Sequence, residues 1–305
     1  MNIKNLLLTA GMLIISIFAF SQNSADKRQD IVYKTVKGHN IIASIYLPKS
    51  KEKVPVVVYF HGGGFMFGNR EQGLSSVLKE KLLANGIAVI SADYRLSPES
   101  KLEEILADVN DAVAWIKHNG ANKFNIDINK IAVAGGSAGG YLALSAGFKP
   151  QSGLNAIVAI SPPTGFSTEG IQAADLSLLN DIQKDSIISY GDYTTRMDLW
   201  RHLGKNGLAL YEIFGFDPVK EPQKLERYTL TNNVKTGYPP TLIIHAKNDH
   251  LVKFADAQAF YTFLQEKDIE SELYIVENGH DSTLIKQHPE AADKIVAFLK
   301  KWFNK

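Results

Sequence analysis

The sequence predicts an α/β protein with a mostly parallel central sheet of about eight strands and helices on both faces. Short runs of β-branched and aromatic residues alternate with longer helical patterns, which implies right-handed crossovers between parallel strands. One of these runs, 54–60 (VPVVVYF), is apolar at nearly every position, as is typical of a strand covered on both faces. The alternation stops once and then resumes, so one domain with an insertion is expected.

The composition is that of a globular protein with a large core. The chain has 305 residues, of which 45% are hydrophobic, and 33 basic residues stand against 32 acidic ones. Because no basic run or broad basic face is present, nucleic acid is not an expected partner. The chain has no cysteine, which excludes disulfides, thiol nucleophiles and zinc–thiolate sites.

The first residues predict a cleaved export signal. Lys4 precedes an apolar run at residues 6–20, which is shorter than the ~20 residues of a membrane-spanning helix. Small residues at Ala19 and Ser21 favour cleavage after Ser21, with an uncleaved membrane anchor as the alternative. We therefore expect a signal peptide at 1–21, a single folded domain at 22–305, export to the periplasm or the medium, and no stable membrane span after cleavage.

The remaining elements are expected in a regular order. An antiparallel hairpin turns at Gly38–Asn40, and a helix after the first buried strand ends near Asn85–Gly86, where glycine is a common helix terminator. A second helix is expected to end at Gly120. The other expected strands are 31–35, 41–47, 87–91, 131–134, 156–160, 241–245 and 272–276, and the other expected helices are 102–119, one after Ala138, 255–265 and 290–303.

Residues 167–236 interrupt the alternation with polar and aromatic helical pieces. A structureless loop of that length is improbable inside a domain, so an inserted helical cap is predicted. Its aromatic residues either form the core of the cap or stack on a sugar or aromatic acyl group of a substrate. These aromatic residues are Phe166, Tyr190, Tyr193, Trp200, Tyr211, Phe214 and Phe216.

A glycine-rich turn follows the strand at 131–134. Gly135 and Gly139 stand two residues on either side of Ser137, a G-x-S-x-G pattern in which larger side chains would collide across a sharp strand-to-helix turn. The dinucleotide-binding and P-loop patterns both fail, because a serine occupies the central glycine position of the first and Tyr141 the lysine position of the second. A structural glycine turn remains the alternative to a nucleophile.

A second glycine-rich segment, His61-Gly62-Gly63-Gly64-Phe65, follows the first buried strand, at the sheet edge where open α/β sheets bind ligands. Backbone N–H groups of Gly62 and Gly63, with that of Ala138, are predicted to stabilise an oxyanion. His61 is expected to be structural.

Activation of a serine requires a base and a carboxylate that orients it. His280 follows the last expected strand and Asp249 the strand before it, which gives the chain order serine, aspartate, histidine. His245 and His250 are the competing bases, and Asp281 is a poor orienter because a sequence neighbour cannot easily reach the histidine Nδ1. The remaining histidines, His39, His118, His202 and His288, are expected at the surface.

Together these motifs resemble the α/β-hydrolase fold, and within it the carboxylesterases similar to hormone-sensitive lipase and related exported acetyl and feruloyl esterases. The resemblance covers about 55–300 and also includes Asp93-Tyr94-Arg95-Leu96-Ser97-Pro98-Glu99, which it assigns a structural role. It implies Ser137 as nucleophile, His280 as base and Asp249 as orienter. The lipase-like branch usually has aspartate at the position of Gly136, and its DPL-type sequence around the acid is absent here.

The predicted function is hydrolysis of carboxylic esters through an acyl-enzyme, without a metal or organic cofactor. The expected substrate is a small-molecule or glycan-linked ester with a short-chain acyl, acetyl or feruloyl group. An amidase or peptidase with the same residues is one alternative, and a non-catalytic binding protein on a hydrolase scaffold is another. Such binding proteins typically lack the base, whereas His280 is present.

Overall fold

The structure is a computed structural model that describes residues 28–149, 152–169, 171, 173–175 and 192–305. The predicted export signal at 1–21 and Tyr190 of the predicted cap lie outside the described residues. Across this part of the chain, eight strands form a single sheet in the order β1-β2-β4-β3-β5-β6-β7-β8. They are β1 (Gln29–Val36), β2 (His39–Tyr46), β3 (Val54–Phe60), β4 (Ala88–Ala92), β5 (Ile126–Gly136), β6 (Ala156–Ile160), β7 (Thr241–Ala246) and β8 (Ser271–Val276).

The sheet is parallel from β4 to β8 and antiparallel at the β1–β2–β4 edge. The predicted hairpin is present, but its turn lies one residue earlier than expected. Lys37 and Gly38 carry the left-handed conformation, with φ of 47° and 85°, and His39 already pairs with Val36. Two consecutive left-handed residues match the twist of the strands, so the tighter turn prevails.

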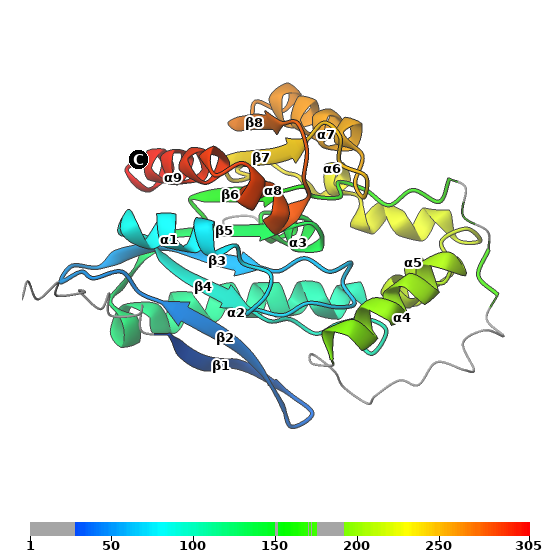
Figure 1. The fold of residues 1–305 in the computed structure, drawn as a ribbon, viewed down its shortest axis with the longest axis horizontal. Coiled ribbons are helices and arrows are strands. Elements are labelled where there is room, and N and C mark those ends of the chain that lie inside the picture. The colour runs from blue at the N-terminus through cyan, green and yellow to red at the C-terminus, as the bar shows by residue number, and fades with distance from the viewer. Residues whose placement is uncertain (1–27, 150–151, 170, 172, 176–191) are drawn as a thin grey trace, which may run out of the picture.

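Helices cover both faces of the sheet, as predicted (Figure 1). One face packs against α1 (Ser76–Ala84), α8 (Asp281–Gln287) and α9 (Glu290–Phe303). The other packs against α2 (Leu102–Phe124), α3 (Ala138–Ala146) and α7 (Phe254–Glu266). Because both faces are covered, the central strand β3 is buried at every position except Pro55.

The second helix is longer than predicted. We expected α2 to end at Gly120, whereas it continues to Phe124 and ends at Asn125, a left-handed residue whose N–H donates to the carbonyl of Gly120. Gly120 is buried, and a Cβ there would lie 3.3 Å from Cβ of Ile126. This glycine therefore allows close packing of the helix on β5 and does not end it.

The inserted segment supplies short helices at the carboxyl ends of the parallel strands. Figure 1 shows α4 (Tyr193–Lys205) and α5 (Ala209–Phe214) beyond the arrowheads of β3 and β5. A 3₁₀ helix, η2 (Pro222–Tyr228), and α6 (Leu230–Asn233) lead back to β7. Of the helices in the described residues, none is long and apolar enough to cross a membrane.

Candidate active site

Ser137 occupies the sharp turn between β5 and α3. Its backbone has φ of 51° and ψ of −121°, a conformation that few non-glycine residues adopt. A Cβ on Gly135 would lie 2.1 Å from the carbonyl oxygen of Gly139, and a Cβ on Gly139 would lie 2.1 Å from that of Phe60. The collisions expected from the G-x-S-x-G spacing are therefore real, and the turn presents Ser137 to a cavity.

The glycine-rich loop after β3 lies against this turn. Gly63 has φ of 120°, and a Cβ there would lie 1.9 Å from the carbonyl oxygen of Phe67. A Cβ on Gly62 would lie 3.2 Å from Cβ of Ser137. The backbones of Gly62 and Gly63 and the first residue of α3, Ala138, therefore line the same cavity as Ser137.

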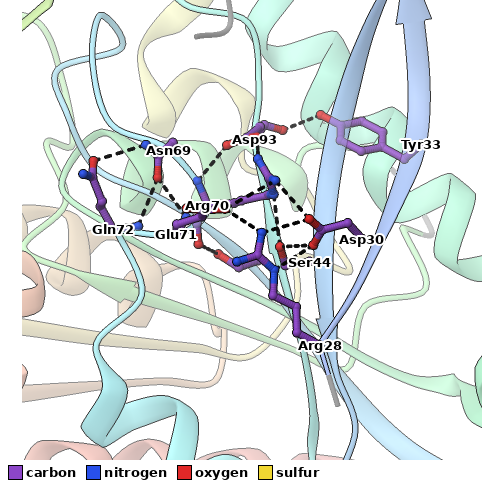
Figure 2. Close-up of polar contacts among 10 residues, drawn as sticks. Arg28, Asp30, Tyr33, Ser44, Asn69, Arg70, Glu71, Gln72 and Asp93 are labelled. Carbon is purple, nitrogen blue, oxygen red and sulfur yellow. Dashed lines mark hydrogen bonds and ion pairs between the residues drawn. The ribbon is translucent and has the colours of Figure 1, made fainter. Parts of the chain in front are cut away.

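A polar network anchors the far end of this loop to the hairpin (Figure 2). Arg70 binds the buried carboxylate of Asp93 twice, through its backbone N–H at 2.7 Å and its guanidinium at 2.6 Å. The same guanidinium reaches Ser44 and Asp30, and a hydrogen bond from Arg28 holds the pKa of Asp30 below its ordinary value. Asp93 is thus a structural carboxylate, in agreement with the role expected for its segment.

The carboxylate of Asp249 and the ring of His280 are hydrogen-bonded, with Oδ2 and Nδ1 2.7 Å apart. The Asp249 side chain is fully buried, whereas 19% of the His280 side chain is exposed. Burial acts to raise the pKa of Asp249, but hydrogen bonds from His280 and from the N–H groups of Val252 and Leu251 hold it below its ordinary value. This carboxylate is therefore ionised and fixed toward one ring nitrogen.

The competing groups do not form this pair. His245 is buried in β7 with Nδ1 2.9 Å from the carbonyl of Ala246, and burial lowers its pKa, so it stays neutral in the core. His250 is exposed. The Asp281 carboxyl accepts a hydrogen bond from Tyr59 at 3.3 Å, away from the Nδ1 that Asp249 binds. Among the other histidines, His39, His118 and His202 are exposed, His288 is half-buried and His61 is buried, where its ring stacks on Tyr94.

The cavity at this edge has a volume of about 800 Å³. Ser137 and His280 both line it, and most of its remaining wall is apolar. None of the described residues in this wall is a lysine or an arginine. The apolar part of the wall comprises Phe65, Phe67, Pro163, Phe166, Tyr193, Trp200, Ala209, Leu210, Ile213, Leu251 and Val252.

The described aromatic residues of the insertion have two kinds of surroundings, and Phe166 shares both, because it lines the cavity and also packs against Phe214. Tyr193 and Trp200 line the cavity and make ring contacts with Phe67 at 5.4 and 5.5 Å. Phe214 instead packs against Phe216 and Tyr228 in the hydrophobic core that covers one face of the sheet. Among the described residues, no cluster of three or more histidines or carboxylates could hold a metal ion.

The sheet order, the strained serine turn and the glycine loop define an α/β-hydrolase. Residues 43–264 match the sequence model of the BD-FAE family. The chain therefore belongs to the BD-FAE family of α/β-hydrolases. The matched range contains Ser137 and Asp249 and ends before His280, so the placement of His280 depends on the structure.

Curated relatives are of two kinds. Stretches of non-reducing polyketide synthases are similar to 79–87% of this chain. The stretch in a synthase of Penicillium roqueforti is 26% identical and covers 87% of this chain. The chain spans only 13% of that synthase. A probable carboxylesterase of a Phoma species is 27% identical, with 76% of this chain and 82% of the relative covered.

Two solved structures are similar over nearly the whole chain. An esterase of Pyrobaculum calidifontis is 27% identical with a TM-score of 0.67, covering 90% of this chain and 85% of its own. An α/β-hydrolase superfamily protein of Enterococcus faecalis, 22% identical with a TM-score of 0.70 over 91% of this chain and 100% of its own, supports the fold. The Phoma relative is a probable carboxylesterase and the Pyrobaculum protein is an esterase, so the similar proteins that cover most of this chain include ester hydrolases.

Proposed function

We propose that the protein hydrolyses carboxylic esters by acyl transfer to water. The observation that carries this proposal is the 2.7 Å hydrogen bond between Asp249 and His280, on the wall of a cavity that also presents Ser137. A histidine held in this way keeps one tautomer, which leaves its other nitrogen available to a serine hydroxyl. The proposed roles are nucleophile for Ser137, base for His280, orienter for Asp249 and oxyanion donors for Gly62, Gly63 and Ala138.

In the first step, the Ser137 hydroxyl attacks the ester carbonyl while His280 accepts its proton. The negative charge on the tetrahedral oxygen is stabilised by backbone N–H groups, each of which is worth ~3 kcal/mol when well placed. His280 then protonates the leaving alcohol, and an acyl-enzyme remains on Ser137. Water repeats the cycle and releases the acid.

The wall of the cavity supports an uncharged substrate. Its described lining is mainly aromatic and aliphatic and contains no lysine or arginine that would pair with an acidic acyl group. We propose short-chain acyl, acetyl and feruloyl esters, including those on glycans. Tyr193 and Trp200 would contact an aromatic acyl group or a sugar ring.

The experiment that tests the function compares wild type with Ser137→Ala. Wild type is expected to react with a fluorophosphonate probe and to hydrolyse p-nitrophenyl acetate, whereas Ser137→Ala should do neither while it remains folded by circular dichroism. Ser282→Ala, at a second serine of the cavity wall, should keep the label. Turnover by Ser137→Ala at the wild-type rate would refute the assignment.

The substrate class needs a separate measurement. A p-nitrophenyl acyl series run beside acetylated xylan, methyl ferulate and matched anilides distinguishes acyl length and ester from amide. Ester hydrolysis is expected to be at least 100-fold faster than hydrolysis of the matched anilide, because an amine is the poorer leaving group. Faster anilide hydrolysis would indicate an amidase.

We also propose that residues 1–21 are a cleaved export signal, that 22–305 form one hydrolase domain and that 167–236 are its cap. The apolar run before Ser21 supports export. N-terminal sequencing of the protein recovered from its host is expected to begin at Gln22. A start at Met1 in the membrane fraction would indicate an anchor.

A further inference from the structure

The carboxyl group of Asp281 lies against the two glycine segments of the active site. A Cβ built on Gly136 would lie 1.6 Å from Oδ1 of Asp281, and one built on Gly62 would lie 2.2 Å from Oδ2. For Gly136, the three nearest atoms all belong to this carboxyl group. The carboxyl group therefore occupies the space that a side chain at either glycine would need, between the residue before Ser137 and the loop that carries the proposed oxyanion donors.

The backbone at Asp281 is held in an uncommon conformation that directs the side chain inward. Its φ is 50°, in the left-handed region, which costs a residue other than glycine about 1 kcal/mol or more. Its N–H donates to Oγ of Ser161 at 3.2 Å, which ties it to the end of β6. The chain therefore places a carboxyl group at a strained position where glycine would fit more easily.

The carboxyl group is also close to the proposed base. The titratable groups that act on it are His280 on its own segment, Tyr59 of β3 and Tyr94 of the segment after β4. Burial raises the pKa of Asp281 to about 6. A positive charge on His280 acts in the opposite direction and favours the ionised form of the Asp281 carboxyl group.

From these contacts we propose that Asp281 is a positioning residue of the esterase site, whose carboxyl group spaces the oxyanion loop (Gly62 and Gly63) from the turn that carries Ser137 and places a titratable charge between them. The proposal rests on the proposed function. It assigns Asp281 two separable roles, one steric and one electrostatic, and the residue does not contact the reacting atoms in this scheme.

Asp281→Asn isolates the electrostatic role. Asparagine has nearly the same shape and tolerates the left-handed backbone, so the spacing is retained. We expect the variant to lack the step in the pH profile of kcat/KM that ionisation of the Asp281 carboxyl group near pH 6 gives the wild type. At the optimum, kcat should stay within about threefold of wild type.

Asp268→Asn is the matched control. Asp268 is also left-handed, with φ of 55°, is exposed and lies before β8, away from the cavity. The Asp268→Asn substitution removes the same charge from the same backbone conformation, so its pH profile of kcat/KM should coincide with that of wild type. Coincidence of the Asp281→Asn pH profile with that of wild type would refute the electrostatic role.

A double-mutant cycle isolates the steric role. Gly136→Ala should lower kcat by about tenfold or more, because its methyl group displaces the carboxyl group. In the Asp281→Gly background, where the space is empty and the backbone conformation is unstrained, the same substitution should cost less than threefold. Equal costs in both backgrounds would refute the steric role.

A measurement without substrate separates this inference from the proposed function. In Ser137→Ala protein labelled with ¹³C-aspartate, the Asp281 carboxyl signal is identified as the one that disappears when Asp281 is replaced by asparagine. This signal should titrate with a midpoint near pH 6. A midpoint below about 4 would refute the inference even if the protein is an esterase. If the Asp281 signal shows the expected midpoint but wild type has no esterase activity, only the proposed function is refuted.

Discussion

The nucleophile turn and the cap helix α4 face each other across one cavity, but different forces hold them in place. At the turn, backbone atoms contact backbone atoms: Gly135, Gly139 and Phe60 approach so closely that no side chain fits between them. At α4, one long side chain carries the contact. Arg196 is buried and makes two bonds to the Glu99 carboxylate, at 2.8 and 3.0 Å.

The cap contact also reaches the glycine loop. Arg196 donates to the carbonyls of Met66 and Ser97, and on the next cap helix Glu212 pairs with Lys101 at 2.8 Å. Tyr193 and Trp200 precede and follow Arg196 by three and four residues, so the three residues share one face of α4, and the buried ion pair anchors the helix that carries both cavity aromatics. The comparison teaches that contacts between nearby residues fix the conformation of the proposed nucleophile, whereas buried ion pairs fix the wall that is proposed to contact the substrate.

The largest expected effect is on the chemistry. Asp249→Asn keeps the size of the side chain but removes the charge that selects the His280 tautomer, so kcat should fall about 10,000-fold with little change in KM. Stopped-flow or steady-state hydrolysis of p-nitrophenyl acetate measures it. Asp256→Asn, at an exposed position of α7, is the control and should be silent. A loss below tenfold would point to another orienting carboxylate.

The next effect concerns the cap. Arg196→Met leaves the buried Glu99 carboxylate without its cation, which should lower the free energy of unfolding by about 3–5 kcal/mol in urea titrations. The double variant with Glu99→Gln should recover part of this loss. Arg201→Met, on the same helix with an exposed partner, Asp198, should cost less than about 1 kcal/mol.

Equal losses for Arg196→Met and Arg201→Met would show that the buried pair does not hold the cap. The two variants should also differ in kinetics. Because Arg196 anchors the helix that carries the cavity aromatics, its loss should raise KM for bulky esters more than for acetate, whereas the Arg201 variant should leave the ratio unchanged.

Glycine-to-alanine substitutions compare the turn at Ser137 and the helix α4 directly. Gly139→Ala places a methyl group 2.1 Å from the Phe60 carbonyl, so the backbone has to move, at a cost of about 1–3 kcal/mol and a loss of activity. Gly204→Ala, in α4, has no atom within 4 Å and should stabilise the protein by about 0.5–1 kcal/mol. Thermal unfolding of both variants measures the contrast, and the same sign of change in both would contradict it.

The last expected effect depends on pH and concerns Asp281. Its pKa is raised from 3.8 to about 6 by burial, so between these values the folded protein retains a proton that the unfolded chain releases, and stability falls as pH rises. Asp281→Asn should therefore unfold at a higher Tm than wild type above pH 6, by about 1–2 kcal/mol in free energy, and at a similar Tm near pH 4. If Asp281→Asn were more stable than wild type at pH 4 but not at pH 8, the pH dependence of stability assigned to Asp281 would have the wrong sign.

The elements with a strong local pattern were predictable from the sequence. The strands β3 and β6 and the helix α9 begin and end where the pattern indicates, because each is a continuous apolar run or a regular amphipathic repeat. The seven-residue helix α8 was not predicted, since two turns are too short for a periodic signal. The end of α2 was misplaced because Gly120 serves packing with Ile126, a contact that only the folded chain contains.

For the candidate site, the residue types and their order along the chain were enough to nominate Ser137, Asp249 and His280, because strand ends of a parallel sheet converge on one edge. The sequence alone also determined the strained serine turn, since glycine spacing reflects collisions within a few residues. Only the tertiary structure decided that Arg196 holds the cap and that the Asp281 carboxyl group occupies the space above Gly136 and Gly62. Those contacts join residues distant in sequence, and their geometry depends on how independent segments pack together.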